Sequence, residues 1–343
     1  MKKGMRSYMK WMKKIASGAL ALLLAGSLTA CGGDTSWAYR SGDDTVTSGM
    51  YIGLSINALN TAYSLEGFDN TKTPFQQKLE GEDAVQWLKE KTEELAREYL
   101  AVEQKFDEMG LTLAENEVNG VSATVELYWT TLGMGTSYTD AGCGKESFTK
   151  IYTNSAKRGR LFQIIYGEGG EKEVPESELK TIFANDYAKG TYFTVALTDK
   201  DGNALTGADL IDKKEEAQKL ADRIAGGEDI EEVKAEYNGT DKSDDSSVVI
   251  QRSNENLTAG GTAIVKGKAG ESGMVTDDKY AYVYLVQDPL SGDTFENYRS
   301  TVLQNLKGDE FNETVAEWAA AVTLEENAAS LRKHSPKHLK SLL

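Results

Sequence analysis

Histidine is almost missing from this chain of 343 residues, which has only His334 and His338, both within the last ten positions. A Ser-His-Asp triad and a zinc site built on histidine both need imidazoles held in a folded core. Because the rest of the chain offers none, the sequence excludes those mechanisms. It predicts no metal site, no cofactor and no catalytic residue.

Cysteine is nearly as scarce, since only Cys31 and Cys143 are present. If Cys31 is used elsewhere, Cys143 has no partner for an internal disulfide, and no histidine lies near it to activate the thiol. Its flanking residues, Gly142 and Gly144, separate two helical patterns. We predict that Cys143 is a passive residue in a loop.

The segment before Cys31 has the order of a secretory signal. Six basic residues come first, an apolar run follows over 15–25, and Leu28-Thr29-Ala30 directly precedes the cysteine. This order is typical of a signal peptide, and the residues at its end resemble a bacterial lipobox, in which the cysteine is acylated. The resemblance implies a signal peptide over 1–30, a lipid on Cys31 and a location on the cell membrane, facing the extracytoplasmic side. A buried helix that ends at a core cysteine is the alternative.

Positive charge is in short supply. The chain has 38 Lys and Arg against 54 Asp and Glu. Cleavage after residue 30 would remove six basic and no acidic residues, which leaves 32 against 54 and a net charge of −22. Such a charge repels the phosphate backbone, so nucleic acid is excluded as a partner.

The first half of the mature chain is helical in pattern. Residues 31–48 are rich in Gly, Ser, Asp and Thr and are predicted to be a flexible tether. Residues 49–190 show helical spacing, and the clearest stripe lies within 85–109, where apolar residues recur every three or four positions. We therefore predict a helical N-terminal domain over 49–190.

Residues 191–290 follow a different pattern. An apolar strand at 192–197 precedes two short amphipathic helices, a strand at 248–250 and a strand at 280–286 with alternating tyrosines. This order predicts a small α+β module.

The chain then returns to helices. Residues 291–330 are predicted to form C-terminal helices whose apolar stripe packs on the N-terminal domain, and 331–343 a poorly ordered basic tail. The predicted fold class is α+β, with a discontinuous helical domain and a small inserted α+β domain. A homodimer that exchanges the closing helices remains an alternative.

Several stretches together resemble the PrsA and SurA-like extracytoplasmic foldases. VPESELKTIFANDYAKGTYFTVAL is similar to the family's linker helix and first strand of a parvulin domain, and AQKLADRIAGGEDIEEVKAEYN to the parvulin helix pair. KAGESGMVTDDKYAYVYLV is similar to the closing segment, and FENYRSTVLQNLKGDEFNETVAEW to the C-terminal helices. The resemblance covers about half of the mature chain. It implies a chaperone domain that carries a parvulin-type peptidyl-prolyl isomerase domain.

The parvulin-like stretch departs from the family where catalysis is expected. Active parvulins carry a histidine on the first strand and another on the last. Here those positions fall near Ala196 and on Ala281 or Tyr282. The family's Gly-Gly-x-Leu-Gly stretch is replaced by VVIQRSNENL. No catalytic residue carries over, which predicts a degenerate domain.

An apolar pocket lined by Phe193, Met274 and Tyr282 is the candidate peptide-binding site in this domain. Prolyl isomerisation breaks no covalent bond, so such a pocket can assist it by removing water from the amide. The alternative is that all three are ordinary core residues of a small sheet.

The sequence thus predicts a lipid-anchored extracytoplasmic chaperone that assists the folding of exported proteins. Its partners would be unfolded or partly folded exported polypeptides, together with the membrane through the lipid on Cys31. Whether the protein is an enzyme stays open, and an active peptidyl-prolyl isomerase without histidine is the first alternative. A solute-binding lipoprotein is the second, although it would need two lobes of alternating strands and helices.

Overall fold

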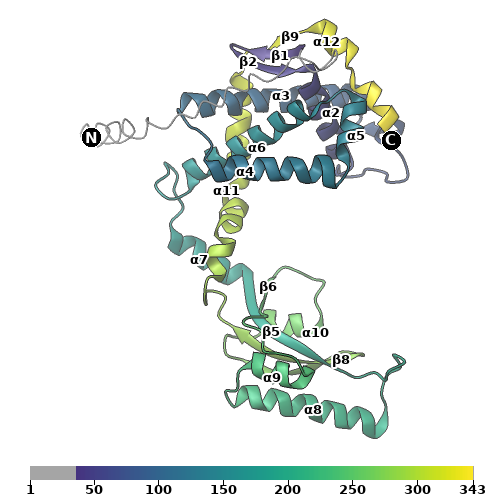
Figure 1. Cartoon of the computed structure of the whole chain (residues 1–343), viewed down its shortest axis with the longest axis vertical. Helices are drawn as coiled ribbons and strands as arrows, with labels where there is room; N and C mark the ends of the chain where they lie inside the picture. The colour runs from purple at the N-terminus through teal and green to yellow at the C-terminus, as the bar shows by residue number, and fades with distance from the viewer. Residues whose placement is uncertain (1–35, 343) are drawn as a thin grey trace, which may run out of the picture.

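The computed structural model describes residues 36–342, and the predicted signal peptide and Cys31 lie outside them. The described chain forms an upper helical body and a lower α+β module, linked by a pair of helices (Figure 1). The mixed α+β class predicted from the sequence is confirmed. Within residues 36–342, no helix is both long and apolar enough to span a bilayer.

The helices and strands follow one another along the chain with few long loops. The helices are α2 (Ser48–Ala62), α3 (Ala84–Glu108), α4 (Glu115–Glu126), α5 (Met134–Ala141), α6 (Lys145–Tyr166), α7 (Glu176–Asp186), α8 (Gly207–Ala225), α9 (Ile230–Asn238), α10 (Ala259–Lys266), α11 (Thr294–Ala321) and α12 (Ala328–Lys333). The short helical turns are η1 (Pro74–Gln76), η2 (Leu127–Thr131) and η3 (Pro336–Leu342). The strands are β1 (Trp37–Ser41), β2 (Asp44–Thr47), β3 (Lys78–Leu79), β4 (Glu82–Asp83), β5 (Tyr187–Ala196), β6 (Val248–Gln251), β7 (Ser272–Thr276), β8 (Tyr280–Gln287) and β9 (Glu325–Glu326).

Helix α3 is the central element of the helical body and was predicted within two residues of its bounds. It begins where the Asp83 side chain accepts hydrogen bonds from the backbone N–H groups of Val85 and Gln86. It ends before Gly110, whose φ of +62° suits a residue without a side chain. The helix packs against α2, α6 and α11, so it is enclosed on several sides.

A three-stranded sheet, in the order β2-β1-β9, covers the end of the helical body farthest from the α+β module (Figure 1). The prediction of a flexible tether over 31–48 is wrong for its described part. Strands β1 and β2 pair antiparallel, and Ala38 and Val46 are fully buried against the helices. Burial of these side chains outweighs the polar composition of the segment.

The C-terminal segment is also ordered, contrary to the prediction of a loose basic tail over 331–343. Helix α12 and turn η3 lie along the helical body, and Leu339 is only 4% exposed within its core. Lys340 lies over the ring of Phe75 at 5.3 Å from its centroid. Leu339 anchors the segment because its apolar side chain packs into the core that also contains Ile52 and Leu88.

The α+β module is built on a four-stranded antiparallel sheet in the order β6-β5-β8-β7. Alternation along β5 and β8 gives the sheet two apolar faces. Helices α8 and α9 cover one face with residues such as Ala217, Ile224 and Val233, and α10 packs against the other. The predicted strands and helices of this module are all present, and β5 begins five residues earlier than predicted.

Helix α11 connects the two bodies. Most of the predicted C-terminal region forms one helix of 28 residues, and α12 begins at its end. Its first turns pack on α7, where Phe295 meets Phe183, and its later turns pack on α3 and α6, where Phe311 meets Phe162. The helix continues through Gly308, and this glycine is buried.

Candidate functional site

The structure does not bring the three predicted pocket residues together. Phe193 and Met274 lie on the face of the sheet that α8 and α9 cover, and both belong to its core. Tyr282 pairs with Thr194 on the opposite face, against α10. A Cβ atom on Gly260 of α10 would lie 2.7 Å from the Tyr282 ring, which shows how closely this helix approaches. The sheet therefore separates Tyr282 from the other two.

The face that carries Tyr282 is rich in phenols. Its ring lies 5.8 Å from that of Tyr192 and 6.1 Å from that of Tyr280. The Tyr282 hydroxyl donates a hydrogen bond to Asp277 Oδ2 at 2.7 Å. Burial, followed by this hydrogen bond, raises the pKa of Tyr282 to about 12. The phenol therefore stays protonated near neutral pH and cannot act as a general base there.

The positions where the family resemblance expects histidines lie on neighbouring strands. Ala196 pairs with Tyr280, and Ala281 pairs with Val195. Both alanines lack any group that could exchange a proton or donate a hydrogen bond from the side chain. The sheet is thus present, and neither alanine carries acid–base chemistry. Tyr282, the other candidate for the last-strand position, carries the phenol that donates to Asp277.

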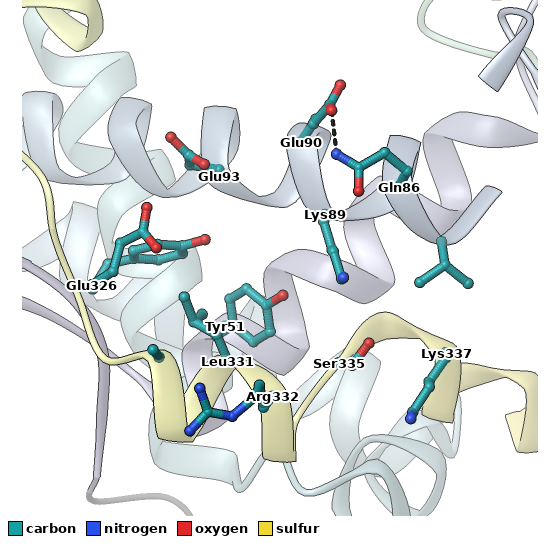
Figure 2. A pocket seen from close by; sticks show the side chains of 13 residues that line it. Tyr51, Gln86, Lys89, Glu90, Glu93, Glu326, Leu331, Arg332, Ser335 and Lys337 are labelled. Atoms are coloured by element: carbon teal, nitrogen blue, oxygen red, sulfur yellow. Dashed lines mark hydrogen bonds between the residues drawn. The ribbon is translucent and has the colours of Figure 1, made fainter. Parts of the chain in front are cut away.

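The helical body holds a cavity of about 600 Å³ between α3 and the C-terminal segment. Figure 2 shows Gln86, Glu90 and Glu93 along α3 on one side and Arg332 and Lys337 on the other. Apolar and aromatic residues complete the wall; they are Tyr39, Tyr51, Val85, Ala328 and Leu331. The cavity therefore combines an apolar lining with charges of both signs.

A second cavity of about 350 Å³ continues along α3 on the side of α11 and shares Glu90 and Glu93 with the first. Its apolar wall is the alanine stripe of α11, made of Ala316, Ala319 and Ala320. We call the two cavities together the α3 groove. Its lining residues on α3 run from Val85 to Glu98.

Ion pairs fix part of the rim of this groove. Arg97 lies 2.9 Å from Glu93 and donates a hydrogen bond to the Val322 carbonyl at 3.0 Å, which ties α3 to the end of α11. Glu98 pairs with Arg158 of α6 at 2.7 Å. Glu90 accepts a short hydrogen bond from Gln86. The carboxylates are thus held along one side of the groove.

The phenols in the groove are not reactive groups. Burial raises the pKa of Tyr51 to about 12, and the nearby carboxylates of Glu326 and Glu93 add to the increase. Burial and the neighbouring Tyr51 and Glu93 also raise the pKa of Tyr39 far above its ordinary value. Across residues 36–342, no group of three or more His, Cys, Asp or Glu side chains is placed to hold a metal ion. The α3 groove offers apolar and charged contacts for binding.

Reasoning from the sequence missed this groove. The alanines of α11 and the glutamates of α3 are individually ordinary, and only packing of α11 on α3 brings them together. The available signal was the Glu-rich face of residues 90–98 opposite a stretch of four alanines at 316–321. Cys143 does lie in a loop, between α5 and α6, and is fully buried, which suits a passive thiol.

No protein-family model matches the chain, and no curated protein does. Among solved structures, it is similar to the foldase protein PrsA from Streptococcus pneumoniae, with 11% identity and a TM-score of 0.36, covering 88% of this chain and 99% of that one. It is also similar to PrsA from Bacillus subtilis, with 15% identity and a TM-score of 0.31, covering 88% of this chain and 98% of that one. Likenesses of this degree transfer neither activity nor residue roles.

Proposed function

We propose that the protein is a lipid-anchored extracytoplasmic chaperone that captures unfolded exported polypeptides in the α3 groove. The observation that carries this proposal is the groove itself, two cavities that share Glu90 and Glu93 and have an apolar wall and a charged rim. Unfolded segments expose apolar side chains beside polar backbone, and such a mixed surface can hold them without strict sequence preference. Capture slows aggregation while the client folds.

The anchor and the degenerate isomerase domain belong to the same proposal. The lipobox-like residues before Cys31 support acylation at that position, which places the folded chain on the extracytoplasmic side of the membrane. The sequence resemblance to PrsA and SurA-like foldases supports a parvulin-like role for the α+β module. Its lack of histidine supports an inactive one.

The test changes the apolar wall of the groove. Ala316 and Ala320 are exposed on α11, so A316E and A320E together place two charges on the wall without disturbing the core. We expect the double variant of the chain from residue 32 onward to lose most of its suppression of client aggregation. That chain keeps every described residue.

The matched control is the double variant A123E and A225E, which makes the same substitution at exposed helical alanines outside the groove. It should suppress aggregation as well as the unaltered chain. Equal loss in the two double variants would remove the groove from the proposal. Absence of suppression by the unaltered chain would end the proposal as a whole.

An active peptidyl-prolyl isomerase is the second candidate, and the observation that favours it is the exposed ring of Tyr280 beside the buried Tyr282 at the edge of the face that α10 covers. Desolvation of a prolyl amide against aromatic rings lowers the barrier without an imidazole. Phe193 and Met274 lie on the other face of the sheet, so they would only pack in its core and would not contact the prolyl amide. A deletion of 191–290 that abolishes isomerase activity would support this candidate.

A solute-binding lipoprotein is the less favoured alternative. Such a protein needs two lobes of alternating strands and helices. The described chain has one four-stranded antiparallel sheet and a helical body instead. A thermal-shift screen with small solutes would test it.

A further inference from the structure

The C-terminal segment carries a cluster of positive charge on an acidic protein. Arg332, Lys333, Lys337 and Lys340, which we call the basic patch, are all exposed. Residues 327–343 contain no Asp or Glu. Throughout residues 36–342, no carboxylate lies within salt-bridge distance of any of the four.

The geometry of the segment gathers these charges. Lys337 and Lys340 are three residues apart in the 3₁₀ turn η3, so they lie on one face of it. Arg332 and Lys333 end helix α12 just before that turn. Lys89 of α3 is exposed and points toward the same segment (Figure 2).

A chain of hydrogen bonds ties this segment to the start of the described chain. Ser36 Oγ lies 2.6 Å from Ser48 Oγ, and Ser48 Oγ lies 2.6 Å from Ser330 Oγ in α12. Asn327 also donates to the Trp37 carbonyl at 3.0 Å. Ser36, the first described residue after Cys31, is therefore linked through Ser48 to the helix that carries Arg332 and Lys333.

The covalent distance to the anchor is short. Only four residues separate Cys31 from Ser36, so the chain between them spans at most about 18 Å when fully extended. Strand β1, β9 and α12 lie together at the end of the molecule opposite the α+β module (Figure 1). A lipid on Cys31 would hold this end, and with it the basic patch, close to the bilayer.

We propose that the basic patch docks on an anionic phospholipid surface and orients the anchored protein with its α+β module pointing away from the membrane. This inference rests on the proposed lipid on Cys31 for its geometry, but the docking itself does not need the lipid. Charge complementarity favours anionic headgroups, because lysine and arginine near such a surface are attracted to it.

The remaining charge of the protein strengthens this orientation. The chain after residue 30 has 32 Lys and Arg against 54 Asp and Glu, and its net charge of −22 repels an anionic surface from other faces. Attraction acts only within about 10 Å at moderate salt. In strand β9, which precedes α12 in the chain, Glu325 is already paired with Arg40 at 2.6 Å. Glu326 lies in the α3 groove. Arg332 and Lys337 also line the α3 groove, and Lys340 lies over the Phe75 ring. Because none of the four side chains is in a salt bridge within residues 36–342, the patch keeps its positive charge and can select one face.

The test is sedimentation of the chain from residue 32 onward with vesicles of phosphatidylcholine, with or without phosphatidylglycerol. We expect salt-sensitive binding only to vesicles that contain phosphatidylglycerol. Replacing the four residues of the basic patch by glutamine should weaken this binding at least about tenfold. The matched control replaces four exposed lysines of the α+β module by glutamine, and it should bind like the unaltered chain; these are Lys200, Lys214, Lys219 and Lys279.

A second measurement uses the unaltered chain, in case the patch variant does not fold. Phosphatidylglycerol vesicles should protect Lys333 and Lys337 from amine-reactive labelling while Lys214 and Lys219 stay reactive. Equal loss of binding in patch and control variants, or equal labelling at both ends, would overturn the inference. Neither vesicle sedimentation nor lysine labelling contains a client protein. Their results therefore do not depend on whether the α3 groove captures clients.

Discussion

The helical body and the α+β module differ in how far apart in the chain their core residues lie. The core under α8 and α9 comes from a single stretch, 193–283. The core around α2 and α3 draws on residues from Ala38 to Val322, and its neighbour reaches Leu339. The core of the module therefore forms from one continuous stretch of chain. The core of the helical body forms only when residues from both ends of the described chain pack together.

This difference predicts two separately measurable unfolding transitions. The described tryptophans all lie in the helical body, and the module contains none, so tryptophan fluorescence reports on one region; the residues are Trp37, Trp87, Trp129 and Trp318. Circular dichroism reports on both. The two probes together separate the unfolding of the two regions.

The largest expected effect is that of Phe311→Ala. Phe311 is 3% exposed and contacts Phe162 and Trp318, with ring centroids 5.3 and 6.1 Å apart. Its loss should lower the free energy of unfolding of the helical body by about 3–5 kcal/mol. Denaturant titration followed by tryptophan fluorescence measures this loss. The counterpart Phe193→Ala should shift circular dichroism and leave the tryptophan midpoint in place, and coincident shifts would show one cooperative unit instead.

Leu339→Ala tests whether the C-terminal segment belongs to the helical core. The side chain is 4% exposed, so its truncation should cost about 2–5 kcal/mol, seen as a lower denaturant midpoint by tryptophan fluorescence. Leu306→Ala is the control, because Leu306 is 38% exposed and should change stability by about 0.5 kcal/mol at most. An unchanged free energy of unfolding in Leu339→Ala would support the loosely ordered tail that the sequence predicted.

The same comparison explains what the sequence could predict. The apolar periodicity of the sequence predicts helix α3 and strand β8, and their bounds were predicted within two residues. Strands β1 and β9 are too short to show any period. Strand β1 pairs with its neighbour β2, and β9 forms because it pairs with β1 nearly 290 positions away, as Glu325 does with Arg40.

The candidate site was harder to predict than the fold. The pocket proposed from Phe193, Met274 and Tyr282 ignored the alternation of strands, which places Tyr282 on the other face. The α3 groove depends on the docking of α11 on α3, which no local pattern specifies. Side-chain chemistry is visible in the sequence, but cavities are a property of packing.

Two glycine substitutions should affect the two regions in opposite directions. A Cβ on Gly190 of β5 would lie 2.6 Å from the Leu285 carbonyl oxygen, so Gly190→Ala should destabilise the module by about 1–3 kcal/mol. Gly159 of α6 has open space around it, so Gly159→Ala should stabilise the helical body by about 0.5–1 kcal/mol. Circular dichroism and tryptophan fluorescence, respectively, follow the two changes. A stabilising Gly190→Ala would contradict the tight packing of β5 on β8.

The smallest expected effect is a pH dependence at His334. Burial, followed by the positive charge of Lys333 and the nearby His338, lowers the pKa of His334 below its ordinary 6.5. The unfolded chain therefore binds a proton at His334 more readily than the folded chain does. The contribution of neutral His334 to the free energy of unfolding is fully present above pH 6.5 and is lost as pH falls through the folded-state pKa. Tryptophan-detected midpoints across this range should fall less in His334→Gln. An identical pH profile in both proteins would exclude His334 as the cause.

The central claim is that the protein holds unfolded clients and does not isomerise their prolines. The most direct measurement follows refolding of a client whose slow phase is limited by a trans-to-cis proline, with the chain from residue 32 present at increasing concentration. We predict that the final yield rises while the slow rate stays constant. A slow rate that increases with the concentration of the chain would contradict the claim and show a working isomerase without histidine.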